Sequence, residues 1–119
     1  MSVKKATLNP RKLAKSIAGF ASDKKAENIL VLDMRQMVNF CDYFVICSGN
    51  TDRHVRAIAD GIDQAVEDLG LKIRFKQGFE QSVWVVLDLG DVVVHVFQKQ
   101  MREFYRLEHL WREAKKMSW

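Results

Sequence analysis

Residues 83–97 read VWVVLDLGDVVVHVF and decide the fold. Two short apolar runs meet at Gly90 and Asp91, a pattern that predicts a β-hairpin with a tight turn. A strand that is open to water on one side alternates apolar with polar residues, and neither run does so. We therefore expect the hairpin to be covered on both faces of its sheet. A chain of this length forms few helices, so we do not expect its own helices to cover both faces.

The chain has 119 residues, which is the size of one domain with one core, spanning 1–119. Its charge is divided along the sequence. Residues 1–25 carry seven Lys or Arg against one Asp, residues 26–98 carry six against eleven acids, and residues 99–119 carry six against three. The segment that should form the sheet is acidic, which favours a basic protein over nucleic acid as its partner. Nucleic-acid binding through the basic ends is an alternative, and predicts a steep salt dependence of affinity.

The remaining composition indicates a cytoplasmic protein without metal or cofactor. Cys41 and Cys47 lack the further ligands of a structural zinc site and are expected in the core. His54, His95 and His109 do not have the spacing of a zinc-binding helix. No stretch approaches the roughly 20 apolar residues of a membrane span, and the start has no secretory apolar segment.

Periodicity and turn residues predict the other elements. Asn9 and Pro10 start a helix that ends near Asp23, and a second helix begins after Thr51 and is closed by Gly70. Buried strands are expected at 26–33 and 43–47, an edge strand at 71–75, and a last helix at 101–114. The order is helix, strand, strand, helix, three strands, helix. This predicts an α/β domain with a single mixed sheet of about five strands.

One enzymatic alternative deserves a test. Ser48 and Gly49 lie where a strand turns into a helix, as in nucleotidyltransferases, which then hold magnesium with nearby carboxylates. Asp88 and Asp91 are the candidate carboxylates, but they flank a hairpin turn. With one glycine and no adjacent lysine, the Ser48–Gly49 turn also makes a poor phosphate cradle.

Two groups of aromatic residues are candidates for a protein interface. Trp84 and Phe97 lie near opposite ends of the hairpin; Phe97 is expected in the core, whereas Trp84 is equally suited to the core and to a partner's pocket. On the last helix, Arg102, Tyr105, Glu108 and Trp111 follow one another at intervals of three. They form either a solvated face or an interface.

Several blocks of the sequence together resemble the ribosomal silencing factor family, also called Iojap-related. They are DKKAENI at 23–29, DYFVICSGN at 42–50, VRAIAD at 55–60, WVVLDLGDVVVHVF at 84–97 and REFYRLEHLW at 102–111. The blocks occur in order over residues 13–114. Gln77 stands where the family usually has Glu, and His54 where it often has Gln.

The resemblance implies a homodimer that binds large-subunit ribosomal protein fourteen. In that position it blocks joining of the two ribosomal subunits and lowers translation when nutrients are short. It also implies a fold related to nucleotidyltransferases but without their catalytic carboxylates or activity. We expect the partner contacts among eight residues: Asp42, Tyr43, Asn50, Trp84, Asp88, His95, Arg102 and Tyr105.

Overall fold

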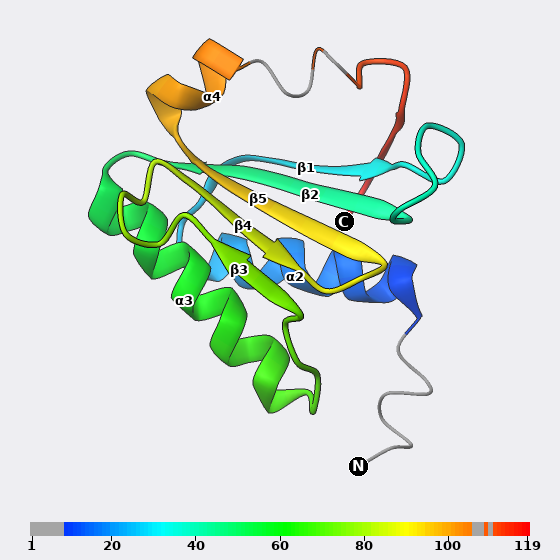
Figure 1. Cartoon of the computed structure of the whole chain (residues 1–119), viewed down its shortest axis with the longest axis horizontal. Helices are drawn as coiled ribbons and strands as arrows, with labels where there is room; N and C mark the ends of the chain where they lie inside the picture. The colour runs from blue at the N-terminus through cyan, green and yellow to red at the C-terminus, as the bar shows by residue number, and fades with distance from the viewer. Residues whose placement is uncertain (1–8, 106–108, 110) are drawn as a thin grey trace.

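The computed structural model describes residues 9–105, 109 and 111–119 and has one mixed β-sheet (Figure 1). The sheet has six strands in the order β3-β4-β5-β2-β1-β6. The strands are β1 (Glu27–Asp33), β2 (Tyr43–Gly49), β3 (Phe75–Gln77), β4 (Trp84–Asp88), β5 (Val92–Gln98) and β6 (Lys115–Met117). The helices of the described residues are α2 (Pro10–Asp23), α3 (Asp52–Asp68) and α4 (Lys99–Tyr105). The predicted mixed α/β class with a single sheet is confirmed.

The hairpin formed by residues 83–97 lies near the centre of this sheet. β4 and β5 pair antiparallel, with Val85 opposite Val96 and Leu87 opposite Val94. β5 continues the sheet on its other side by pairing with β2 in parallel, and β2 pairs antiparallel with β1. Trp84 and Phe97 face each other directly at the open end of the hairpin. Our expectation that they lie at opposite ends was therefore wrong.

The two long helices begin where their caps predict. The Asn9 side chain accepts a hydrogen bond from the Lys12 N–H, and the Thr51 side chain accepts one from the His54 N–H. Each bond satisfies a backbone donor of the first turn that has no partner within the helix. Gly70 follows α3 with a φ of 81°, a left-handed conformation that suits glycine.

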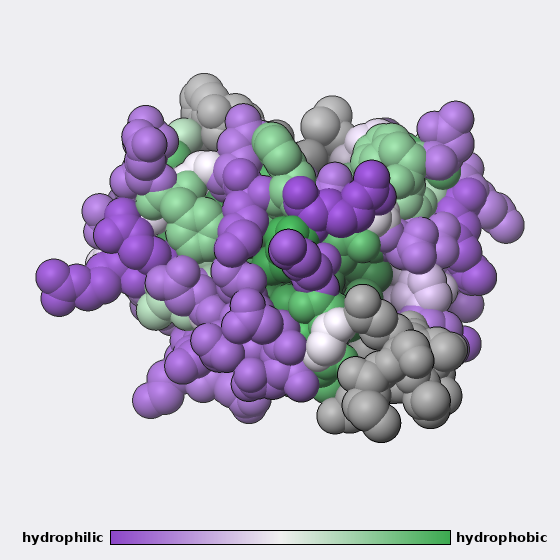
Figure 2. All heavy atoms as spheres, turned by 60° about the horizontal axis from the view of Figure 1, so that its bottom comes forward, coloured by the Kyte–Doolittle hydropathy of each residue, from purple (hydrophilic) through white to green (hydrophobic). Residues whose placement is uncertain are grey.

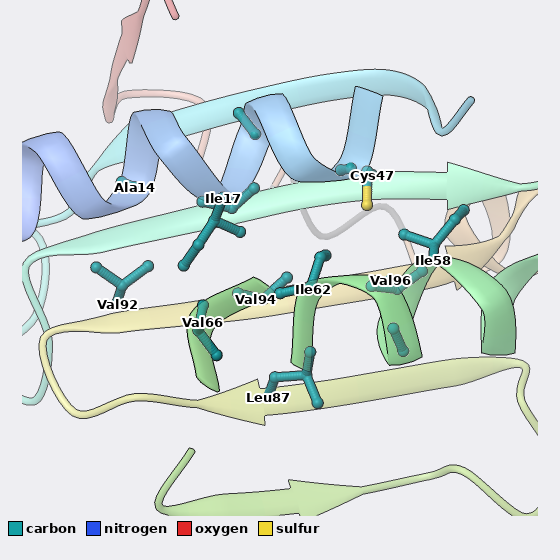
Figure 3. Close-up of a cluster of buried hydrophobic side chains, with 14 of the residues drawn as sticks. Ala14, Ile17, Cys47, Ile58, Ile62, Val66, Leu87, Val92, Val94 and Val96 are labelled. Carbon is teal, nitrogen blue, oxygen red and sulfur yellow. The ribbon is translucent and has the colours of Figure 1, made fainter. Parts of the chain in front are cut away.

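α2 and α3 both pack on one face of the sheet, which we call the helix-covered face (Figure 1). Side chains of these helices meet those of β2, β4 and β5 in a single apolar core (Figure 3). Ile17, Ile62 and Leu87 are among its fully buried members. Truncating such a side chain to Ala lowers the stability by about 2–5 kcal/mol in typical cores. This layer therefore contributes strongly to the packing of the sheet on its helices.

Part of the second layer comes from the chain itself, contrary to our expectation. Every residue from Val92 to Phe97 is buried, so β5 is covered on both faces. On the face opposite the two helices, a second apolar cluster includes residues of the 34–41 loop and of the C-terminal segment, among them Met34, Cys41 and Ala114. β4 alternates between buried and half-buried residues, so its second face is only partly covered.

Two elements differ from the predicted ones. The edge strand is β3 at Phe75–Gln77 instead of 71–75, because Leu71 and Ile73 turn in to pack on the core. Of the predicted last helix, residues 101–105 lie in α4 and His109 is also helical, but 111–114 are not: residues 111–113 form a turn, and Lys115–Met117 form β6. β6 is the sixth strand, pairing antiparallel with β1. The predicted helix positions Leu107 and Leu110 lie outside the described residues.

Candidate partner-binding face

The face of the sheet opposite α2 and α3, which we call the second face, carries three of the predicted contact residues. Successive side chains of a strand point to opposite faces. Val85 and Leu87 belong to the helix-covered core, so Trp84, Val86 and Asp88 lie on the second face. His95 pairs with Val86 in the sheet and shares that face. The structure therefore brings Trp84, Asp88 and His95 together on one side.

An aromatic cluster occupies the middle of the second face. Trp84 stacks on Phe97 with ring centroids 4.9 Å apart and an interplanar angle of 24°. The Trp84 Nε1–H donates a hydrogen bond of 3.1 Å to His95 Nδ1. Phe44 from β2 meets the His95 ring edge to face at 4.7 Å and the Trp111 ring at 6.1 Å. The indole of Trp84 is thus half-buried and fixed in orientation from two directions.

His95 is held in its neutral form within this cluster. Its side chain is 7% exposed, and burial lowers the pKa of His95 to about 4. Because Nδ1 accepts from Trp84, the hydrogen of the neutral ring is on Nε2. Nε2 has no hydrogen-bond partner among the described residues, and neither has Trp111 Nε1. The Phe44 ring lies against both side chains.

Acidic and exposed apolar side chains border the cluster at the end of the sheet that holds the β4–β5 turn. Burial raises the pKa of the Cys41 thiol to about 11, and the charges of Asp42, Asp88 and Asp91 raise it further. Asp42 and Asp91 are neighbours, since the Asp42 N–H donates to the Asp91 carbonyl at 2.7 Å. Phe40, beside Phe44, is 62% exposed, and Phe75, opposite Asp88, is 55% exposed. Apolar side chains rimmed by charge are typical of a protein interface.

The other predicted contact residues lie elsewhere or have another role. Tyr43 is buried in the helix-covered core. Asn50 is exposed at the end of β2, where its side chain donates to Glu27. Arg102 is buried and donates to the Asn28 carbonyl and the Ser48 hydroxyl. Tyr105 ends α4, and its side chain lies outside the described residues.

The residues of the nucleotidyltransferase alternative are not assembled. Ser48 is level with Trp84 across the sheet, whereas Asp88 is four residues further along β4, which is about 13 Å at the usual rise per residue. Asp88 instead accepts a hydrogen bond from the Gly90 N–H and stabilises the hairpin turn. Among the described residues, no group of three or more His, Cys, Asp or Glu could hold a metal ion.

Sequence reasoning missed Phe40, Phe44 and Phe75 as members of this face. Phe44 lies in an uninterrupted apolar run, in which periodicity gives no face for any residue. The sheet face on which Phe75 lies could have been predicted only if the bounds of β3 had been correct. Phe40 was the most accessible to prediction, since it is a large aromatic residue in the segment between two predicted strands.

The opposite side of the molecule has a different surface. Viewed from the side of α2 and α3, hydrophilic side chains cover most of the surface around a hydrophobic strip at its centre (Figure 2). None of the described helices is long and apolar enough to cross a membrane. The fold and the site thus define a class: a small mixed α/β protein with a polar helical side and an aromatic, acid-rimmed face suited to binding a partner.

Comparison with known proteins gives the family within this class. Residues 7–119 match the family model described as "Ribosomal silencing factor during starvation", and the chain belongs to this family. The ribosomal silencing factor of Bacillus subtilis is 45% identical over 107 residues, which cover 90% of this chain and 91% of that protein. The chloroplastic protein Iojap of Zea mays is 36% identical over 85% of this chain and 44% of its own length.

Solved structures support the same conclusion. A crystal structure of a Chromobacterium violaceum protein matches with a TM-score of 0.85 and 29% identity, over 93% of this chain and 92% of that one. A crystal structure from Bacillus halodurans matches with a TM-score of 0.77 and 40% identity, over 87% of this chain and 95% of that one. The family resemblance seen in the sequence is therefore confirmed.

Proposed function

We propose that this protein binds large-subunit ribosomal protein fourteen through the second face of its sheet and so prevents the small subunit from joining. The family's silencing role during starvation supports this proposal. Steric exclusion requires only that the bound protein occupies space that the small subunit needs. It makes no covalent bond and uses no cofactor, and it lowers translation when nutrients are short.

The observation that carries the proposal is the fixed, half-exposed indole of Trp84. Aromatic anchors that enter a partner's pocket dominate the energy of many interfaces. Stacking on Phe97 and the hydrogen bond to His95 restrict the rotamers of Trp84 before binding. Little side-chain entropy is then lost on association, which strengthens the complex.

Charge supports a basic partner. Asp42, Asp88 and Asp91 gather around the β4–β5 turn: the Asp42 N–H donates to the Asp91 carbonyl, and the Asp88 carboxylate accepts from the Gly90 N–H. Arg74 beside Gly90 offsets part of their charge. Complementary charge mainly raises the association rate, whereas buried anchors mainly lower the dissociation rate. We therefore assign steering to the carboxylates and retention to the aromatic cluster.

The remaining parts of the proposal follow from the family resemblance. The protein acts in the cytoplasm as a homodimer, and the exposed Phe40 and Phe75 offer apolar area for a second copy or for the ribosomal protein. Asn50, Arg102 and Tyr105 are proposed as minor contacts, Tyr43 as a support from within the core, and ribosomal RNA as a secondary partner. The kinship of the fold with nucleotidyltransferases also stays a prediction.

A subunit-joining assay tests the proposed function. Purified large subunits are incubated with the full chain, small subunits are added, and sedimentation separates joined from free subunits. We expect the free fraction to rise with protein concentration. An Asp91→Asn variant should bind large subunits with an association rate lowered about two- to threefold and a nearly unchanged dissociation rate. A protein that ignores large subunits and leaves joining untouched contradicts the proposal.

A further inference from the structure

A pocket of about 510 Å³ lies between β1, the end of β2, α4 and β6. Its lining includes three basic residues, Lys99, Arg102 and Lys116, and one acid, Glu103. The basic residues come from α4 and β6, and they meet β1 and β2 there although these segments are far apart in sequence. Three of the six basic residues of 99–119 therefore meet at one end of an otherwise acidic sheet region.

Arg102 is held rigidly in this pocket. Its side chain is buried, and Nη1 donates to the Asn28 carbonyl at 2.6 Å and to Ser48 Oγ at 2.9 Å. Asn28 has a φ of 50°, and the pairing of β1 with β2 shifts register there between Glu27 and Leu30. Asparagine adopts this left-handed conformation more readily than most residues, so the irregularity costs little here. At this irregularity of β1, the Asn28 carbonyl accepts a hydrogen bond from the Arg102 guanidinium.

Ser48 provides a buried donor at the same place. The residue is 1% exposed, and its oxygen already accepts from Arg102. Within the described part of the chain, no acceptor takes the hydrogen of the Ser48 hydroxyl. A buried donor without an acceptor is unfavourable unless something else satisfies it. The lining residues Ser48 and Arg102 thus combine a hydroxyl donor with a positive charge in one pocket.

We propose that this pocket binds a phosphate group. The Ser48 hydroxyl donates to one of its oxygens, and the buried Arg102 and the exposed Lys116 supply positive charge. Lys116 forms no ion pair with any described residue, whereas Lys99 lies 4.0 Å from Glu27. A phosphate suits this set better than a carboxylate, because it carries more charge and offers more acceptor oxygens to separate donors. This inference goes beyond the proposed function and does not depend on it.

Titration calorimetry of the full chain with inorganic phosphate at constant ionic strength tests the pocket. We expect saturable binding that Ser48→Ala weakens about tenfold, the effect of losing one hydrogen bond to a charged group. Lys116→Gln, an exposed change that spares the fold, should weaken it about threefold. The matched control is Lys72→Gln, which removes another exposed lysine that is outside the pocket lining, just before the opposite edge strand β3.

Two further ligands identify the source of the phosphate. Adenosine monophosphate tests a small molecule, and a short single-stranded RNA tests a nucleic-acid backbone. Either ligand supports the proposal if its binding falls with Ser48→Ala and Lys116→Gln but not with Lys72→Gln. The proposal is overturned if phosphate binding is not saturable, or if the three lysine and serine variants weaken it equally. A negative result in these phosphate-binding experiments does not change the outcome of the subunit-joining assay.

Discussion

Acid should destabilise this protein through His95. The folded side chain has a pKa of about 4, lowered by burial from the usual 6.5. Protons therefore bind the unfolded chain more readily than the folded one. The stabilising contribution of neutral His95 is complete above pH 6.5 and is lost as the pH falls from 6.5 towards 4.

The size of this loss follows from the two pKa values. At pH 5 the unfolded side chain is almost fully protonated and the folded one is mostly neutral, which lowers the free energy of unfolding by about 2 kcal/mol relative to pH 7. At pH 4 and below the loss approaches about 3 kcal/mol. Such a change is a large fraction of the stability of a typical small domain.

Urea denaturation at pH 7 and pH 5 measures this loss, with His95→Phe as the comparison. The variant loses the Trp84 hydrogen bond at both pH values, and carboxylates titrate in both proteins, so these effects cancel in the difference. We expect the wild type to lose about 2 kcal/mol more than the variant. Equal losses in the two proteins would refute the conclusion that His95 is buried in its neutral form.

Three further predictions concern the backbone and assembly. Gly78→Ala should cost about 2–3 kcal/mol in urea denaturation and displace Trp84, because Gly78 has a φ of 93° and an added Cβ would lie 2.1 Å from the Trp84 carbonyl oxygen; Gly19→Ala, in open space, is the control and should not destabilise. Thr51→Ala should lower the thermal stability by about 1 kcal/mol, since it removes the cap on His54 N–H, and Thr51→Ser should restore most of it. Sedimentation equilibrium at micromolar concentration should give a dimer, and a monomer there would contradict the proposed assembly.

Much of the fold could be predicted because its signals are local. Asn9, Thr51 and Gly70 mark helix ends through side-chain bonds or backbone conformation within a few residues of themselves. The hairpin likewise follows from its own turn. β6 could not be predicted, because Lys115–Met117 is short and becomes a strand only by pairing with β1, which is distant in sequence.

The candidate site was less predictable because it depends on tertiary contacts. Trp84, Asp88 and His95 could be placed on one face, since alternation along a hairpin is a local property. Arg102 looked like a surface residue on a helix face, and its burial depends on the Asn28 carbonyl at the bulge of β1, which accepts from its guanidinium. Tyr43 fell on the helix-covered face because one residue along a strand reverses the direction of the side chain.

The most direct test of the central claim is the affinity for large ribosomal subunits of wild type, Trp84→Ala and Trp119→Ala. Trp119 is an exposed tryptophan at the end of the chain and serves as the matched control. We predict that Trp84→Ala weakens binding about thirtyfold or more, the usual cost of a removed aromatic anchor. The affinity of Trp119→Ala should stay within about twofold of wild type, because exposed residues outside the anchor of an interface contribute little to binding. If a folded Trp84→Ala protein binds large subunits as tightly as wild type, the second face is not the ribosome-binding surface.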